Sequence, residues 1–187
     1  MDYGLANQTG RISQTELEKI LAQAESCGIG FIDTAQAYGD AELRIGSLPN
    51  IERFKTITKI GIGIEKTFKP NAVISLVHES CTKLKRSNLY AVMLHRPEVL
   101  FSCFGKCILE ELKELKAKNI ISKIGVSIYD VSILREIIKI WEFDIVQAPF
   151  NVFDQRFLAS GWGEKLKDSG VEVHTRSAFL QGLLMMP

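Results

Sequence analysis

Four residues of the sequence have side chains that could together move a proton to a substrate: Asp33, Tyr38, Lys59 and His95. A lysine ammonium beside a phenol stabilises the phenolate and lowers the tyrosine pKa, so that Tyr38 can donate a proton near neutral pH. An aspartate paired with Lys59 would hold that lysine in place and keep it charged. A neutral histidine could hydrogen-bond a substrate carbonyl oxygen. The set therefore indicates protonation of an oxyanion as it develops.

These four side chains contain no source of electrons. Reduction of a carbonyl therefore requires a bound hydride donor, such as a nicotinamide cofactor. A metal site is not expected, because Cys103 and Cys107 are four residues apart but no second ligand pair stands at a spacing typical of zinc. The four cysteines include no C-x-x-C pair, and reduced thiols fit better than a disulfide framework.

Each of the four candidate residues also has a structural interpretation when it is taken alone. Asp33, which precedes Thr34, fits a turn or cap residue, and Tyr38 fits a half-buried packing aromatic. Lys59 fits a solvated surface charge, and His95 fits a loop residue. Chemistry is favoured by the joint placement, because all four lie at or just beyond the end of an apolar run.

A repeating pattern of short apolar runs and amphipathic segments must position these residues. The runs predict strands at residues 30–32, 54–58, 89–94, 120–126, 143–146 and 171–175. The first of these runs is typical of a buried strand. Segments with apolar residues at helical spacing stand between them, and a further one precedes the first run, extending from a Ser13–Glu16 capping box to Gly28. Asp40 and Asp130 are predicted to cap later helices, Pro70 or Asn71 is predicted to open another, and residues 157–166 are predicted as one helix. The unit is βα, repeated six times.

Apolar strands separated by helices predict parallel pairing with right-handed crossovers and helices covering the sheet. The carboxyl ends of such strands meet at one edge, where ligands bind. A doubly wound sheet would carry G-x-G-x-x-G after its first strand, whereas the closely spaced Gly61 and Gly63 lack the third glycine. Polar residues at the strand ends favour instead an α/β barrel of the (β/α)8 TIM barrel type, here incomplete with six recognisable parallel strands.

Composition and charge narrow the class of partner. The 187 residues fit a single domain over residues 1–187, with 46% hydrophobic and 24% charged residues. The net charge of +1, from 23 basic and 22 acidic residues, indicates neither a nucleic-acid nor a membrane surface. The N-terminus lacks a basic-then-apolar signal pattern, so we expect a cytoplasmic protein that acts on a small molecule.

Five short segments of the chain carry a resemblance to a known family. They read FIDTAQAYGDAE, TITKIG, VMLHRP, IGVS and VQAPFN, and they begin at residues 31, 56, 92, 124 and 146. In this order they resemble the aldo-keto reductase family of NADPH-dependent barrels, over residues 2–184. The resemblance implies that Asp33, Tyr38, Lys59 and His95 form the catalytic tetrad. Tyr38 would protonate an aldehyde or ketone that accepts hydride from NADPH.

The resemblance also implies contacts to the cofactor. Ser127 and Gln147 match positions that bind the nicotinamide carboxamide, although many members have asparagine where Ile128 follows the serine here. Arg176, followed by Ser177, stands where an aromatic residue often stacks on the nicotinamide. A guanidinium can stack on an aromatic ring, but its charge would disfavour the oxidised cofactor.

Length is the largest departure from the family. A complete barrel needs about 250 residues or more, and this sequence has 187. By the resemblance, one strand would precede Met1 and another would follow Pro187, and the two would leave one contiguous gap. The family's contacts to the adenosine phosphates would then be missing. We therefore expect weak cofactor binding and self-association through open sheet edges.

Three hypotheses for function remain open on the sequence. The first is an aldo-keto reductase that uses NADPH. The second is a lyase in which Lys59 forms a Schiff base, as strand-end lysines do in barrel aldolases. The third is a binding subunit or inactive truncated barrel without catalysis.

Overall fold

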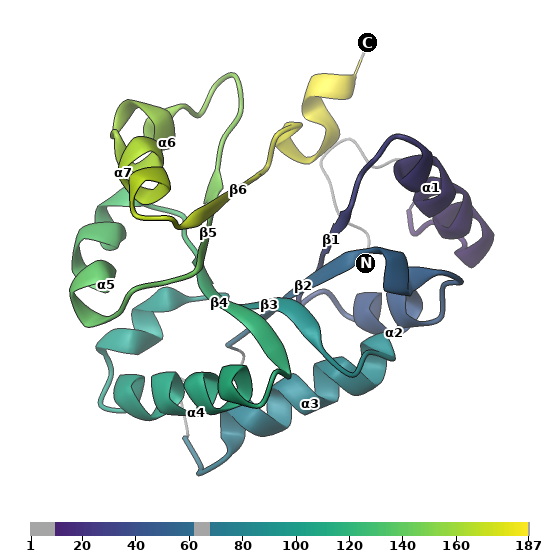
Figure 1. The fold of residues 1–187 in the computed structure, drawn as a ribbon. Coiled ribbons are helices and arrows are strands. Elements are labelled where there is room, and N and C mark those ends of the chain that lie inside the picture. Colours follow the sequence, from purple (N-terminus) through teal and green to yellow (C-terminus); the bar gives the residue numbers. More distant parts are fainter. Residues whose placement is uncertain (1–9, 62–67, 187) are drawn as a thin grey trace.

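The sheet contains six parallel strands that curl into part of a barrel (Figure 1). The computed structural model describes residues 10–61 and 68–186. Within these residues, strand order in the sheet is the same as order in the chain. The strands are β1 (Phe31–Asp33), β2 (Lys55–Ile60), β3 (Leu89–Leu94), β4 (Ile121–Ser127), β5 (Ile145–Pro149) and β6 (Glu172–Arg176). The predicted incomplete (β/α)8 barrel is confirmed, and Gly63 of the rejected glycine motif lies outside the described residues.

The helices lie on the outer, convex side of the curled sheet (Figure 1). None of the described helices is both long and apolar enough to cross a membrane. The α-helices are α1 (Gln14–Ser26), α2 (Ala41–Gly46), α3 (Ala72–Leu84), α4 (Gly105–Ala117), α5 (Leu134–Ile140), α6 (Arg156–Ala159) and α7 (Trp162–Asp168). The short 3-10 helices are η1 (Ile51–Arg53), η2 (Pro97–Phe101), η3 (Val131–Ile133) and η4 (Leu180–Met185).

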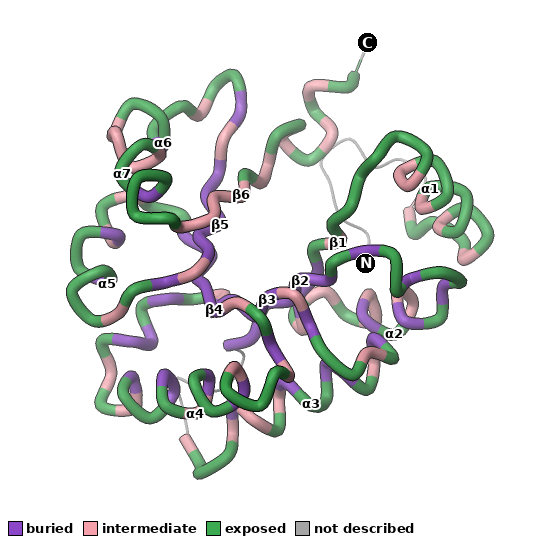
Figure 2. Tube along the Cα trace, viewed as in Figure 1, coloured by how far each residue is buried: buried purple, intermediate pink, exposed green. Residues whose placement is uncertain are grey.

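The main hydrophobic core lies between the outer face of the sheet and helices α3, α4 and α5 (Figure 2). Alternate strand residues point to opposite faces of a sheet, and in the central strand β3 the outward-facing Val92 and Leu94 join this core. A smaller apolar cluster of Ile57, Ala91, Met93 and Ile145 fills the inner face. Representative members of the main core are Val92, Ile124 and Val146 from the strands and Val77, Leu112 and Ile137 from the helices.

Helix caps follow the predicted pattern in two of four places. The Ser13–Glu16 capping box is formed at the start of α1, and the Asp130 carboxylate accepts from the Ser132 N–H at 2.9 Å. Asp40 makes no capping bond and instead pairs with Arg11. The predicted opening of α3 at Asn71 is correct in position, but the capping oxygens come from Glu111 of α4, a partner distant in sequence.

Two further predictions were wrong in detail. The run before Asp33 was predicted as a buried strand, yet Phe31 is 38% exposed because β1 is the first strand of the described sheet and only β2 pairs with it. The segment 157–166 was predicted as one helix, but it divides into α6 and α7 at Gly161, whose φ of 71° is left-handed.

One glycine permits a close approach beside the proposed site. Gly125 of β4 pairs with Ile145 of β5, and a Cβ at Gly125 would lie 2.2 Å from the Ile145 carbonyl oxygen. Any larger residue would therefore separate the two strands. These strands carry Ser127 and Gln147, so Gly125 helps to set the distance between those two side chains.

Candidate active site

The structure brings the four proposed catalytic residues together at the carboxyl edge of the sheet. Asp33 ends β1, Lys59 lies near the end of β2, His95 follows β3 and Tyr38 lies in the loop between β1 and α2. Lys59 Nζ donates to Asp33 Oδ2 at 2.5 Å and to the Thr34 carbonyl at 3.1 Å. Lys59 Nζ is 5.5 Å from the centroid of the Tyr38 ring, and the Tyr38 and His95 rings meet edge to face at 5.9 Å.

Burial lowers the pKa values of both Lys59 and His95. Lys59 is 1% exposed, and burial lowers the pKa of its ammonium, an effect that the Asp33 carboxylate opposes. Burial, followed by the charges of Lys59 and Arg176, lowers the pKa of His95 below its usual 6.5. The lowered pKa favours the neutral ring of His95, which keeps one N–H that can donate to a carbonyl oxygen.

Ser127 and Gln147 are buried side by side on β4 and β5. The Ser127 hydroxyl donates to Gln147 Oε1 at 3.3 Å. Gln147 Nε2 in turn donates to Asp33 Oδ1 at 3.1 Å, across the interior of the curled sheet. A continuous set of hydrogen bonds therefore links the two residues to the Asp33–Lys59 pair.

Arg176 lies at the end of β6 and is held by three contacts. Its guanidinium carbon is 4.0 Å from the centroid of the Tyr129 ring. One of its nitrogens donates to the Ile128 carbonyl at 3.0 Å, and another donates to the Ser177 hydroxyl at 3.2 Å. The guanidinium thus stacks on an aromatic ring of the protein and remains close enough to His95 and Lys59 to affect their pKa values.

The donor set fits the amide end of a nicotinamide. A carboxamide has one acceptor and two donors, and the hydroxyl of Ser127 and the amide of Gln147 supply complementary groups at the same sheet edge. Both side chains lie beside the proposed tetrad rather than at the opposite end of the strands. Ser177 follows Arg176 and turns there with a left-handed φ of 60°. Among the described residues, no group of three or more potential metal ligands occurs.

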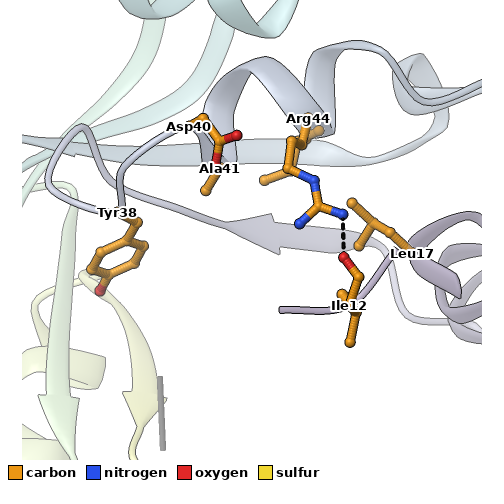
Figure 3. A pocket seen from close by; sticks show the side chains of 7 residues that line it. Ile12, Leu17, Tyr38, Asp40, Ala41 and Arg44 are labelled. Carbon is orange, nitrogen blue, oxygen red and sulfur yellow. Dashed lines mark hydrogen bonds between the residues drawn. The ribbon is translucent and has the colours of Figure 1, made fainter. Parts of the chain in front are cut away.

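Two cavities adjoin the proposed tetrad. The first, of about 300 Å³, lies between α1 and α2 (Figure 3). Figure 3 shows the Tyr38 ring on one side. On the other side, the Arg44 guanidinium donates a hydrogen bond to the Ile12 carbonyl at 2.6 Å. The second cavity, of about 490 Å³, reaches His95 from the other side and is lined by His95, Arg96, Glu98, Val99, Ser102 and Tyr129.

Two residues near the site were missed in the sequence. No sequence pattern pointed to Tyr129 as a site residue, because its contact with Arg176 depends on how strands distant in the sequence pair. Glu42 has the appearance of a surface residue in the first turn of a helix, yet it is 2% exposed and accepts from the Thr58 hydroxyl at 2.7 Å. That bond ties α2, which follows the Tyr38 loop, to the strand that carries Lys59.

Comparisons with known proteins identify the family to which the chain is similar. The model of the aldo/keto reductase family matches residues 2–186. The NADH-specific methylglyoxal reductase of Escherichia coli is 28% identical over 186 residues, covering 88% of this chain and 56% of that protein. D-arabinose 1-dehydrogenase of Saccharomyces cerevisiae is 35% identical over 129 residues, covering 63% of this chain and 38% of that protein.

Solved structures show the same fold. The holo form of an aldo-keto reductase from Bacillus halodurans superposes with a TM-score of 0.78 at 21% identity, over 94% of this chain and 61% of that one. A Gox0644 variant in complex with NADPH superposes with a TM-score of 0.69 at 19% identity, over 95% of this chain and 64% of that one.

The family match extends over nearly the whole chain, and the chain therefore belongs to the aldo/keto reductase family. It spans about half the length of the E. coli relative and less of the yeast one.

Proposed function

We propose that the chain reduces an aldehyde or ketone to an alcohol with Tyr38 as the proton donor. The observation that carries the proposal is the ammonium of Lys59, buried and paired with Asp33 beneath the Tyr38 ring, with neutral His95 against the edge of that ring. Three groups of complementary function thus lie around one phenol.

The charges of the site suit formation of an alkoxide at this position. When bound, a reduced nicotinamide supplies the hydride to the carbonyl carbon. As negative charge develops on the carbonyl oxygen, the Tyr38 hydroxyl donates its proton to that oxygen. The Lys59 ammonium stabilises the phenolate that Tyr38 becomes, and Asp33 keeps the ammonium in position.

His95 orients the substrate in this proposal. The lowered pKa favours the neutral ring, whose single N–H can donate a hydrogen bond to the carbonyl oxygen while Tyr38 supplies the proton. The edge-to-face contact with Tyr38 fixes the His95 ring relative to the phenol. The carbonyl oxygen would then lie between the phenol and the imidazole.

We infer that Ser127 and Gln147 hold the nicotinamide carboxamide, with Arg176 and Ser177 beside it. The resemblance favours NADPH, and one neighbouring structure contains NADPH, whereas the E. coli relative is NADH-specific by its name. Substrate reduction measured side by side with NADPH and NADH decides the preference. We expect faster reduction with NADPH.

Isotope transfer tests the proposed reaction. The chain is incubated with methylglyoxal and a nicotinamide that carries deuterium at the transferred position, and the alcohol is examined by NMR. Deuterium bound to the former carbonyl carbon supports the proposal. An alcohol without deuterium, or no alcohol from any of several aldehydes, contradicts it.

A second candidate function makes Lys59 a Schiff-base nucleophile. It is favoured by the burial of Lys59 and the resulting decrease of its pKa, because an amine must lose its proton before it attacks a carbonyl. The Asp33 carboxylate at 2.5 Å argues against it, since it stabilises the charged form. Borohydride treatment with a carbonyl compound traps a covalent adduct on Lys59 if the lyase is correct, and leaves the mass unchanged if the reductase is correct.

A further inference from the structure

Tyr129 is an exposed aromatic residue that is nevertheless fixed in place. It lies two residues beyond Ser127, and 63% of its surface is exposed. The Arg176 guanidinium covers its ring at 4.0 Å, and the same guanidinium donates to the carbonyl of Ile128, the residue before the tyrosine. Ring and backbone are therefore held by one cation, so little rotational freedom is left to be lost when a ligand binds.

The same ring forms one wall of the cavity of about 490 Å³ that contains His95. The remaining lining residues come from η2 and the residues around it, namely Arg96, Glu98, Val99 and Ser102. The cavity therefore joins the His95 imidazole, where the proposed function places the carbonyl oxygen, to the Tyr129 ring. In this arrangement the groups attached to a bound carbonyl would lie against the Tyr129 ring.

We propose that Tyr129 is a substrate-positioning residue and that the site selects carbonyl compounds with a flat, apolar group next to the carbonyl, such as aromatic aldehydes. This rests on the proposed function, because it takes His95 as the point where the carbonyl oxygen lies. An aromatic pair contributes roughly 0.5–1.5 kcal/mol beyond burial, which corresponds to about tenfold in affinity at its upper end. A small aldehyde without a ring cannot gain this contribution.

The test compares two probes on three variants. Benzaldehyde carries a ring and methylglyoxal does not. Tyr129→Ala removes the aromatic wall, and Tyr129→Phe keeps it. Phe153→Ala is the matched control, because Phe153 is 77% exposed and does not line this cavity. Steady-state reduction gives kcat and KM for each probe, and saturation-transfer NMR reports benzaldehyde binding without any turnover.

We expect Tyr129→Ala to raise the KM for benzaldehyde about tenfold with kcat little changed, and to change the KM for methylglyoxal less than about twofold. Tyr129→Phe and Phe153→Ala should retain the wild-type values. Equal effects on both probes, no effect on either, or no binding of benzaldehyde by the wild type would overturn the proposal. If benzaldehyde binds to the wild type but not to Tyr129→Ala, and neither probe is reduced, the positioning role stands and the reductase function fails.

Discussion

At the scale of single residues, the site depends on a lysine that is both buried and charged. Burial of an ammonium disfavours its charged form, whereas the carboxylate of Asp33 at 2.5 Å and the carbonyl of Thr34 stabilise it. The charge is thus held beside the Tyr38 ring, where the proposed reaction forms a phenolate. Removal of the charge should affect the reaction more than the fold, since Asp33 itself remains partly exposed.

Lys59→Met tests this role of the lysine. We expect reduction to slow by roughly 10²- to 10⁴-fold, the range typical of lost acid–base catalysis, and the pH–rate profile to change because the phenolate loses its stabilising charge. Lys55→Met is the control: Lys55 lies on the same strand, but its ammonium is placed over Phe31 and Tyr90. A pH–rate profile in Lys59→Met like that of the wild type would show that the lysine has no part in proton transfer.

His95 makes stability depend on pH. Its pKa in the folded chain is lower than the usual 6.5, so below about pH 6.5 the unfolded chain binds more protons than the folded one. The contribution of neutral His95 to stability is therefore complete above pH 6.5 and is lost as the pH falls through the folded pKa.

His95→Asn should lose less stability between pH 7.5 and pH 5.5 than the wild type, as measured by urea unfolding. His78→Asn, at an exposed helix position, should behave as the wild type; an equal loss in all three proteins would refute the assignment.

Residues beside strand ends could be predicted, and residues defined by distant partners could not. Asp33, Lys59 and His95 each follow a readable apolar run, so their meeting at one edge follows from parallel pairing. The stack of Arg176 on Tyr129 and the bond of Glu42 to Thr58 join segments far apart in the chain. No local pattern encodes such a pair, because the register of separate elements determines it.

At the scale of elements, strand positions were predicted well because each strand carries apolar or β-branched residues between two helical segments. β3 coincides with the predicted residues 89–94, and the other strands agree within a few residues at their ends. Burial of β1 was mispredicted because an apolar sequence does not reveal whether a strand has neighbours on both sides. The capping of α3 by Glu111 was not predicted, because Glu111 lies on another helix and no local sequence pattern indicates such a distant partner.

Gly125→Ala tests the close approach of β4 and β5. The added methyl would lie 2.2 Å from the Ile145 carbonyl oxygen and 2.5 Å from its Cγ2, so the strands must separate. We expect a loss of about 1–3 kcal/mol in the free energy of unfolding, measured with urea, and weaker cofactor binding because Ser127 and Gln147 move apart. Gly30→Ala is the matched control, since its added methyl has no neighbour within 4 Å. Equal stability of the two variants would contradict the packing argument.

At the scale of the whole molecule, the described sheet has two edges, β1 and β6. Side chains from these strands already meet across the interior, where the Phe31 and His174 rings lie 5.1 Å apart. Such contacts help to hold the curvature that brings Asp33 within reach of Gln147. The backbone groups on the outer side of each edge strand have no strand partner among the described residues, and edges of this kind pair with other chains.

We therefore predict that the purified 187-residue chain self-associates in a concentration-dependent manner, as measured by sedimentation. Thr175→Lys places a charge on the exposed outer part of β6 and should shift the distribution toward monomer. Thr82→Lys adds the same charge on α3, away from the edges, and should leave association unchanged. A wild type that remains monomeric at every concentration would contradict edge pairing.

The central claim is that Tyr38 delivers the proton when a carbonyl is reduced at this edge of the sheet. The most direct test is a single-turnover stopped-flow experiment in which the chain is mixed with saturating NADPH or NADH and an aldehyde, and loss of the reduced nicotinamide is followed. The account predicts hydride transfer by the wild type, and none by Tyr38→Phe although that variant binds the cofactor with nearly unchanged affinity in calorimetric titration. Comparable hydride transfer by Tyr38→Phe, or none by a wild type that binds both cofactor and aldehyde, would contradict it.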